Sequence, residues 1–183
     1  NACYQWQYAR QFTIYNDVVY IADTYGRKVK SLTLTGQCKD IWFTGQYPHA
    51  IAANSNYVFV GHPSNSISVL DHRLNQRSTE SISSNYLSYA WGMSINSAGN
   101  RLAIADYNKN QVVEFSISGT SLSYTQRTNS SYSSSNGYYR RPTDTGYDSS
   151  GNIYALDLYN HRIQKKNSSL AYQTKTGSYS TSS

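Results

Sequence analysis

Three aspartates stand at equivalent places in a recurring sequence pattern, each directly after an apolar segment and directly before a short polar turn. They are Asp23, Asp106 and Asp157. Carboxylates that met around one axis would be suitable ligands for calcium. An aspartate beside a turn also accepts hydrogen bonds from the backbone amides of that turn, and we expect this structural role here. The sequence therefore predicts no metal site and no cofactor.

The turns that follow these aspartates carry residues suited to binding. Tyrosines fall in the same turn of three copies of the pattern, with an arginine or an asparagine close by: Tyr25, Tyr107 and Tyr159, beside Arg27, Asn108 and Asn160. An exposed tyrosine ring offers a large contact area at a low cost in side-chain entropy. The set indicates a surface that binds protein or sugar. The alternative is that the rings pack between neighbouring units as part of the core.

The strands that must position these residues can be deduced from the recurring sequence pattern, which occurs four times. Each copy has an apolar segment, a polar turn and a second apolar segment, in residues 18–29, 57–69, 101–113 and 152–164. Such a hairpin cannot bury its apolar faces alone, so the copies must pack on one another as in a solenoid or a propeller. The turn residues that precede the copies are 38, 42 and 52 residues apart: Asn16, Asn54, Asn96 and Asp148. The first two intervals match the period of a propeller blade, about 40 residues.

Each copy extends to a unit of four strands. A strand of small residues comes first, at 12–15, 50–53, 92–95 and 145–147, and a more polar strand closes the unit at 38–44, 76–82, 122–128 and 170–176. Apolar inner strands that grade into polar outer strands are typical of radially packed blades. We predict an all-β propeller in residues 12–175, an N-terminal edge segment in 1–11 and a Ser/Thr-rich tail in 176–183. The Ser-, Tyr- and Asn-rich insert at 129–139 lengthens the third interval and is expected to be a surface loop.

The fourth unit reads PTDTGYDSSGNIYALDLYNHRIQ in residues 142–164. This stretch resembles the NHL repeat, in which a small-residue strand leads through an acidic-Gly turn to an apolar strand ending in Asp and then to Asn-His-Arg-Ile-Gln. The resemblance implies a β-propeller of four NHL-like blades. Propellers of this family usually have more blades, so three arrangements are open: a closed four-bladed ring, an open arc completed by another copy, and a part of a longer chain. We expect the closed ring ahead of the other two.

Some members of the wider group that the chain resembles are enzymes, among them zinc-dependent lyases with histidines at the starts of the inner strands and calcium-dependent lactonases. The matching positions here are Gln11, His49, Trp91 and Thr143. Only His49 could bind zinc, whereas a catalytic zinc needs about three protein ligands. The chain also has no G-x-S-x-G elbow and no Gly-rich phosphate loop. We therefore expect no enzyme, and His49 and Trp91 join the tyrosines as candidate binding residues.

Cysteine use and glycosylation triplets favour a secreted protein. Cys3 and Cys38 have no metal-site spacing and are expected to form a disulfide that tethers the leading segment, two separate thiols being the alternative. Asn129 and Asn167 each begin an Asn-Ser-Ser triplet that fits the N-glycosylation pattern. No apolar run is long enough to span a membrane.

The number and sign of the charged residues indicate which classes of binding partner to expect. The net charge of +6 comes from 16 Lys and Arg against 10 Asp and Glu, and charged residues are only 14% of the chain, below the usual ~25%. We assign the few basic groups to solvation and expect no nucleic-acid partner. The sequence thus predicts a non-enzymatic extracellular module for protein contact, including self-assembly. The alternatives are a carbohydrate-binding propeller and, third, an RNA-binding propeller that uses its basic residues.

Overall fold

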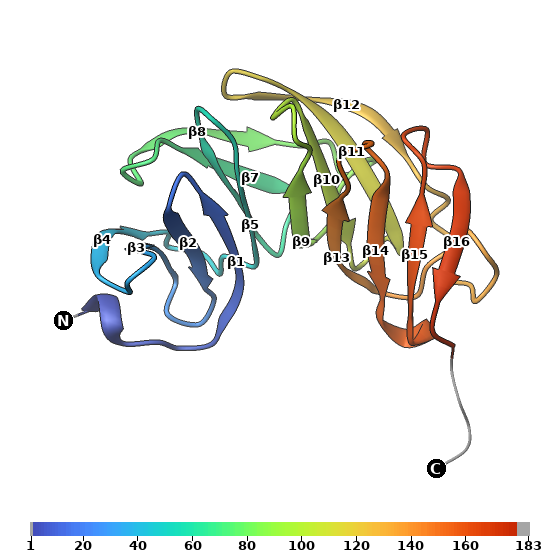
Figure 1. The fold of residues 1–183 in the computed structure, drawn as a ribbon, viewed down its shortest axis with the longest axis horizontal. Coiled ribbons are helices and arrows are strands. Elements are labelled where there is room, and N and C mark those ends of the chain that lie inside the picture. Colours follow the sequence, from blue (N-terminus) through green and yellow to red (C-terminus); the bar gives the residue numbers. More distant parts are fainter. Residues whose placement is uncertain (1, 179–183) are drawn as a thin grey trace, which may run out of the picture.

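The computed structural model of the chain describes residues 2–178 and contains four antiparallel sheets of four strands each (Figure 1). The first sheet, blade 1, contains β1 (Ala9–Tyr15), β2 (Val18–Asp23), β3 (Lys28–Thr33) and β4 (Cys38–Phe43). Blade 2 contains β5 (Ala50–Ala53), β6 (Val58–Gly61), β7 (Ser66–Leu70) and β8 (Gln76–Ser81). Blade 3 contains β9 (Ala90–Ile95), β10 (Arg101–Asp106), β11 (Gln111–Ser118) and β12 (Ser121–Arg127). Blade 4 contains β13 (Pro142–Tyr147), β14 (Ile153–Asp157), β15 (Arg162–Lys166) and β16 (Tyr172–Thr176).

The four-bladed propeller architecture predicted from the repeats is confirmed. Two 3-10 helices, η1 (Ala2–Tyr4) and η2 (Leu158–Asn160), are the helical elements among the described residues, and none of those residues forms a helix long and apolar enough to cross a membrane. The described part of the N-terminal segment begins with η1, and β1 already starts at Ala9. Of the predicted tail, residues 179–183 lie outside the described part of the chain.

Three of the four inner strands begin earlier than the pattern of small residues predicted. β1, β9 and β13 each contain a register shift near their start, at Arg10, Trp91 and Thr143 respectively. The shift is a β-bulge, in which one extra residue stands opposite the partner strand. The extra residue interrupts the alternation of side chains between the two faces of the sheet. The sequence around the bulge therefore lacks the pattern of a strand, although the strand continues through it.

Neighbouring blades pack face to face through alternate residues of their strands. Tyr20, Ala22 and Val29 of blade 1 form one buried cluster with Val58 and Val60 of blade 2. Phe59, Ile67 and Val69 of blade 2 pack in a second cluster with Met93, Leu102 and Ile104 of blade 3. A third cluster joins Ala103 and Val112 of blade 3 to Ile153 and Ala155 of blade 4. The second strands of blades 2 and 3, β6 and β10, are therefore buried on both faces, as their near-continuous apolar sequences require. The outer strands β8 and β12 are polar and largely exposed.

The closed ring that we expected ahead of the open arc is not seen in the described residues. The blades follow one another around an arc, and the ribbons of blade 1 and blade 4 stand apart at its two ends (Figure 1). Phe12 and Ile14 of blade 1 are 64% and 55% exposed, and Leu156 of blade 4 is 43% exposed. One side chain reaches across the axis, since Gln11 Nε2 donates to Asp144 Oδ1 at 2.6 Å.

The recurring aspartates have a structural role that differs in detail from the expected one. Asp23, Asp106 and Asp157 are buried, and each accepts hydrogen bonds from backbone amides of the stretch before the first strand of its own blade, which we call the approach segment. The donors are Gln7 N (2.8 Å), Ser88 N and Tyr89 N (2.8 and 3.1 Å), and Arg140 N (2.7 Å). The prediction of a bond to the following turn is right only for Asp106, which also accepts from Lys109 N. The carboxylates thus fasten each of these three blades, blades 1, 3 and 4, to its own approach segment.

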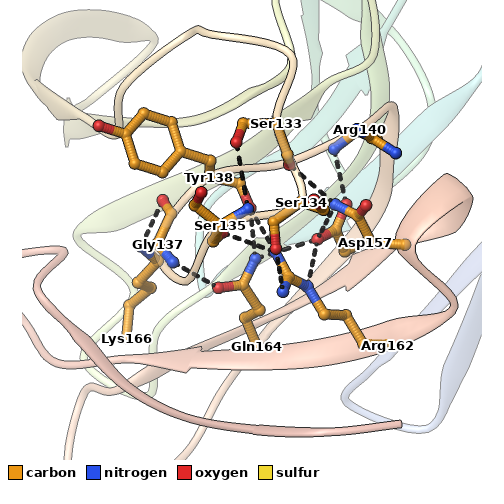
Figure 2. Close-up of polar contacts among 11 residues, drawn as sticks. Ser133, Ser134, Ser135, Gly137, Tyr138, Arg140, Asp157, Arg162, Gln164 and Lys166 are labelled. Carbon is orange, nitrogen blue, oxygen red and sulfur yellow. Dashed lines mark hydrogen bonds and ion pairs between the residues drawn. The ribbon is translucent and has the colours of Figure 1, made fainter. Parts of the chain in front are cut away.

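A second side chain, from the third strand, completes this contact in the same three blades. Lys30 donates to Asp23 Oδ2 (2.8 Å) and to the carbonyl of Gln5, and Gln111 donates to Tyr86 O (2.7 Å). In blade 4 the Arg162 guanidinium donates to Asp157 (2.7 Å) and to the carbonyls of Ser134, Ser135 and Tyr138 (2.8, 2.9 and 3.0 Å; Figure 2). The end of the predicted surface insert is therefore bound tightly to blade 4.

Candidate binding surface

The three bulges and the equivalent point in blade 2 place four side chains at the start of the inner strands. They are Arg10, His49, Trp91 and Thr143. Bulges re-aim a side chain relative to the strand that carries it. The register shows that Arg10, and not Gln11, is the residue of blade 1 that matches His49, because Gln11 pairs with Ala22 whereas Ala50 pairs with Gly61. The match of Gln11 with His49 that the sequence predicted is therefore wrong by one residue.

Four of the residues near these strand starts pack closely around Trp91, and we call the five together the aromatic rim: Arg10, His49, Tyr89, Trp91 and Tyr107. The Arg10 guanidinium carbon lies 3.4 Å from the Trp91 ring centroid, and Tyr107 stacks on Trp91 at 4.2 Å. His49 lies 5.5 Å from Trp91 and 5.1 Å from Tyr89 between ring centroids. A guanidinium over an indole face is a favourable cation–π contact. The rim therefore holds a positive charge against a stack of aromatic rings.

Burial sets the protonation states of the rim. It lowers the pKa of His49 to about 4, with Arg10 and His62 lowering it further through their charges. Burial also raises the pKa of the Tyr89 hydroxyl, which lies 3.1 Å from His49 Nδ1. His49 is therefore neutral at physiological pH, and Arg10 is the positive charge of the rim.

The structure brings some of the predicted binding residues into the rim and others beside it. Trp91, Tyr107 and His49 belong to the rim. Tyr159 lies beside it, and its hydrogen bond with Tyr107 raises the pKa of the Tyr107 hydroxyl. Tyr25 is 62% exposed and packs on Tyr8 at 5.1 Å. Arg27 donates to the hydroxyl of Tyr47 (2.7 Å) and lies over its ring.

The two predicted asparagines take different positions. Asn108 is exposed and accepts from Arg141 Nη1 (3.1 Å), whose guanidinium lies over the ring of Tyr107. Asn160 is only 5% exposed, and its amide donates to Asp157 and to the carbonyl of Ser133. Asn108 thus lies at the rim, whereas the Asn160 amide is used inside blade 4.

Sequence reasoning missed Arg10, Tyr8, Tyr47 and Tyr89, although the sequence carries a signal for them. The strand starts of the first three blades read Tyr-Ala-Arg, Tyr-Pro-His and Tyr-Ala-Trp, in residues 8–10, 47–49 and 89–91. A tyrosine thus stands two residues before the strand-start residue in each. This repeat lies outside the four apolar hairpins, which is why an alignment on the hairpins did not find it.

A cleft of about 400 Å³ adjoins the rim between blade 1 and blade 4. Its lining includes Arg10, Gln11, Trp91 and Asp144. Burial raises the pKa of the Asp144 carboxyl, against the opposing effect of hydrogen bonds from the Thr145 amide and Gln11. The cleft offers a guanidinium, an amide, a carboxyl group and an aromatic edge to a polar ligand group.

The remaining candidates concern metal binding, the disulfide and glycosylation. Within residues 2–178 no three His, Cys, Asp or Glu side chains are grouped so that they could hold a metal ion. His62 lies in the turn between β6 and β7, where it is buried and contacts Ser68 Oγ at 2.9 Å. The predicted Cys3–Cys38 disulfide is present. Asn129 is exposed and Asn167 is half-buried, and both side-chain oxygens accept backbone amides of their own turns.

Comparison with known proteins supports the fold. The NHL repeat matches residues 139–165, which cover blade 4 from the end of its approach segment to β15. The solved structure of hydrazine synthase from Kuenenia stuttgartiensis is similar with a TM-score of 0.66 and 14% identity, over 88% of this chain and 46% of that one. Virginiamycin B lyase from Staphylococcus aureus is similar with a TM-score of 0.68 and 13% identity, over 92% of this chain and 55% of that one. The chain thus spans about half the length of these structures, and no curated protein sequence matches it.

Proposed function

We propose that this NHL-repeat-like β-propeller is a non-enzymatic, extracellular module that binds proteins, and that one of its partners is another copy of itself. The observation that carries the proposal is the aromatic rim, with exposed tyrosines at its margin. Tyr25 and Tyr159 are 62% and 48% exposed. Aromatic rings with arginine are enriched where proteins bind one another, because they bury a large area and lose few rotamers.

The chemistry of the rim supports binding more than catalysis. Arg10, Trp91 and Thr143 stand where zinc lyases of similar fold would need histidines, and His49 alone is a zinc ligand by type. The two enzymes to which the chain is similar share only 13–14% identity with it, so that likeness concerns the fold and not the activity.

An extracellular location fits the disulfide, since such bonds persist in oxidising compartments. It also fits the exposed Asn129 triplet, which would accept a glycan. A reducing and a non-reducing gel of the protein from its source, before and after glycosidase treatment, would test both features.

The binding function is tested with two rim variants and a matched control. Tyr25→Ala and Tyr159→Ala remove exposed tyrosines of the rim margin, and Tyr132→Ala removes a tyrosine that is 55% exposed in the insert. Immobilised chain is probed with a panel of purified extracellular proteins, with soluble copies of itself and with a glycan array. We expect protein binding that the paired rim substitutions weaken at least about tenfold and that the control leaves unchanged.

The lectin alternative gives a different result in the same experiment. Binding to glycans that the rim variants abolish, without binding to any protein, would replace the proposal by a carbohydrate-binding function. Turnover of a substrate by the purified chain would contradict the non-enzymatic part of the proposal.

A further inference from the structure

Each contact between neighbouring blades joins two different faces. In blade 1, Tyr20 and Ala22 of β2 point toward blade 2, and we call this side the forward face. In blade 2, Val58 and Val60 of β6 receive them, and we call this side the backward face. All four of these side chains are at most 1% exposed. The same forward-to-backward contact recurs between blades 2 and 3 and between blades 3 and 4.

Within residues 2–178, no further blade packs on the forward face of blade 4. Tyr154 and Leu156 precede Asp157 by the same intervals by which Tyr20 and Ala22 precede Asp23. They are 37% and 43% exposed, and Ile163, paired with Leu156 on β15, is 40% exposed. Together with Gly146 they line a hollow of about 190 Å³. We call Tyr154, Leu156 and Ile163 the forward end face.

The backward face of blade 1 is uncovered in the complementary way. Phe12 pairs with Ile21 as Ile51 pairs with Val60 in blade 2, and Ile14 pairs with Val19. Phe12 and Ile14 are mainly exposed, and Val19 and Ile21 are half-buried. With Trp6, three of these side chains line an apolar groove of about 370 Å³. We call Phe12, Ile14, Val19 and Ile21 the backward end face.

The backward end face is built like an internal one. Its approach segment is already in place, because Lys30 binds Asp23 and the carbonyl of Gln5, and Trp6 covers the Lys30 ammonium at 3.8 Å. In blades 3 and 4 the approach segment arrives from the outer strand of the preceding blade. In blade 1 the Cys3–Cys38 disulfide anchors it to β4 instead.

We propose that the forward end face of one copy docks on the backward end face of a second copy, head to tail. The occupant is a second copy because the two end faces are the two halves of a contact that this chain makes three times within itself. The proposal rests on the self-assembly part of the proposed function, but it uses a surface separate from the rim tyrosines. Because the two faces differ, the contact is heterologous, and successive copies extend the arc into a ring or a longer assembly.

One charged substitution on each end face tests the docking. Leu156→Asp alters the forward end face and Phe12→Asp the backward end face, and both positions are exposed, so that the chain should still fold. Leu34→Asp is the control, at a leucine that is 58% exposed in the turn after β3. Sedimentation equilibrium from about 1 to 100 μM covers the Kd range expected of such a contact.

The head-to-tail geometry predicts a specific pattern. The wild-type chain and Leu34→Asp form dimers or larger assemblies, and each end-face variant lowers the association constant at least about tenfold. An equimolar mixture of Leu156→Asp and Phe12→Asp recovers a one-to-one dimer, because each variant retains the face that the other lacks.

Two results would overturn the proposal, and they differ in what they leave standing. If the wild-type chain assembles but neither end-face variant weakens assembly, or the mixture recovers no dimer, the head-to-tail contact is wrong while self-assembly through another surface stands. If the wild-type chain is a monomer over the whole range, both the contact and self-assembly are wrong, whereas protein binding by the rim is still decided by the rim variants.

Discussion

Buried charged residues of this propeller act mainly on the backbone of the approach segments. Arg162 is the clearest case, with an aspartate and three carbonyl oxygens as partners and a side chain that is 3% exposed. A buried cation costs desolvation energy that only a complete set of partners offsets. The fold therefore depends on each member of such a set being present.

Arg162→Ala should destabilise the protein strongly. It leaves the Asp157 carboxylate and three carbonyls buried without their cation, and we expect the free energy of unfolding to fall by about 3–5 kcal/mol. Arg77→Ala is the matched control, because Arg77 lies 3.9 Å from Asp71 at the surface with 56% of its side chain exposed, and should cost less than about 1 kcal/mol. Urea unfolding of both variants measures the difference, and equal losses would contradict the assigned role.

His62 should make stability depend on pH. Burial lowers its pKa in the folded protein from the usual 6.5 to about 4. On acidification His62 of the unfolded chain therefore takes up a proton before His62 of the folded protein does. The stabilisation that this difference gives is complete above pH 6.5 and is lost as the pH falls toward 4. Up to about 2–3 kcal/mol of the free energy of unfolding is lost in this way through His62.

The pH effect is measured by urea unfolding of wild-type protein and His62→Asn from pH 7 to pH 4. Asn retains a polar group near Ser68 but does not titrate. The variant should show a shallower fall in the free energy of unfolding. The raised pKa values of the Asp106 and Asp144 carboxyls act in the opposite direction, but they are common to both proteins and cancel in the comparison. Parallel curves would show that His62 makes no such contribution.

Residue types predicted part of the candidate site, and local backbone geometry explains the rest. Tyr107 could be predicted because it lies in the turn after the recurring aspartate, and Trp91 because it lies at the start of an inner strand. Arg10 was missed because a bulge shifts the strand by one residue, and a bulge has no reliable mark in the sequence. Asn160 occupies the same turn as Asn108, but its neighbours Asp157 and Ser133 bind it inside the blade.

At the scale of elements, the apolar strands and their turns could be predicted well, whereas the segments between blades could not. β5 has the predicted bounds, since its short apolar run ends at an asparagine turn. The approach segments have no periodic pattern, because their backbone groups bind side chains of other strands instead of a neighbouring strand. The N-terminal segment illustrates this, with Gln7 N bonded to Asp23 and Gln5 O to Lys30.

Removal of the disulfide should release this N-terminal segment. The bond closes a loop with a sequence separation of 35, for which the chain-entropy model gives a stabilisation of about 3–4 kcal/mol. We expect the double variant Cys3→Ser, Cys38→Ser to lose about this amount in urea unfolding. Hydrogen exchange at the Gln7 amide should also become faster than at the equivalent Arg140 amide, which no disulfide anchors. Unchanged protection at Gln7 would show that the Asp23 and Lys30 contacts hold the segment without the disulfide.

At the scale of the whole molecule, the number of repeats predicted the number of blades but not their closure. Closure depends on the angle between successive blades, and this angle follows from side-chain volumes in three separate interfaces. In the structure the four blades form an arc, with the ribbons of blade 1 and blade 4 apart at its two ends (Figure 1). The expectation of a closed ring followed from the count of units and from the exposed sheet edges that a ring removes, and neither contains information about that angle.

An open arc has unequal stability along its length. In an array of repeats each unit is stabilised by its neighbours, and blades 2 and 3 have two neighbours whereas blades 1 and 4 have one. Amides of β6 and β10 should therefore exchange most slowly, and those of β14 should open at a lower free energy. Native-state hydrogen exchange at a protein concentration low enough to prevent association measures this order. Equal protection of β14 and β10 under those conditions would mean that the forward end face is covered, as in a closed ring. Slower exchange in β14 as the concentration rises would instead follow from a second copy covering Leu156, because docking adds the neighbour that blade 4 lacks.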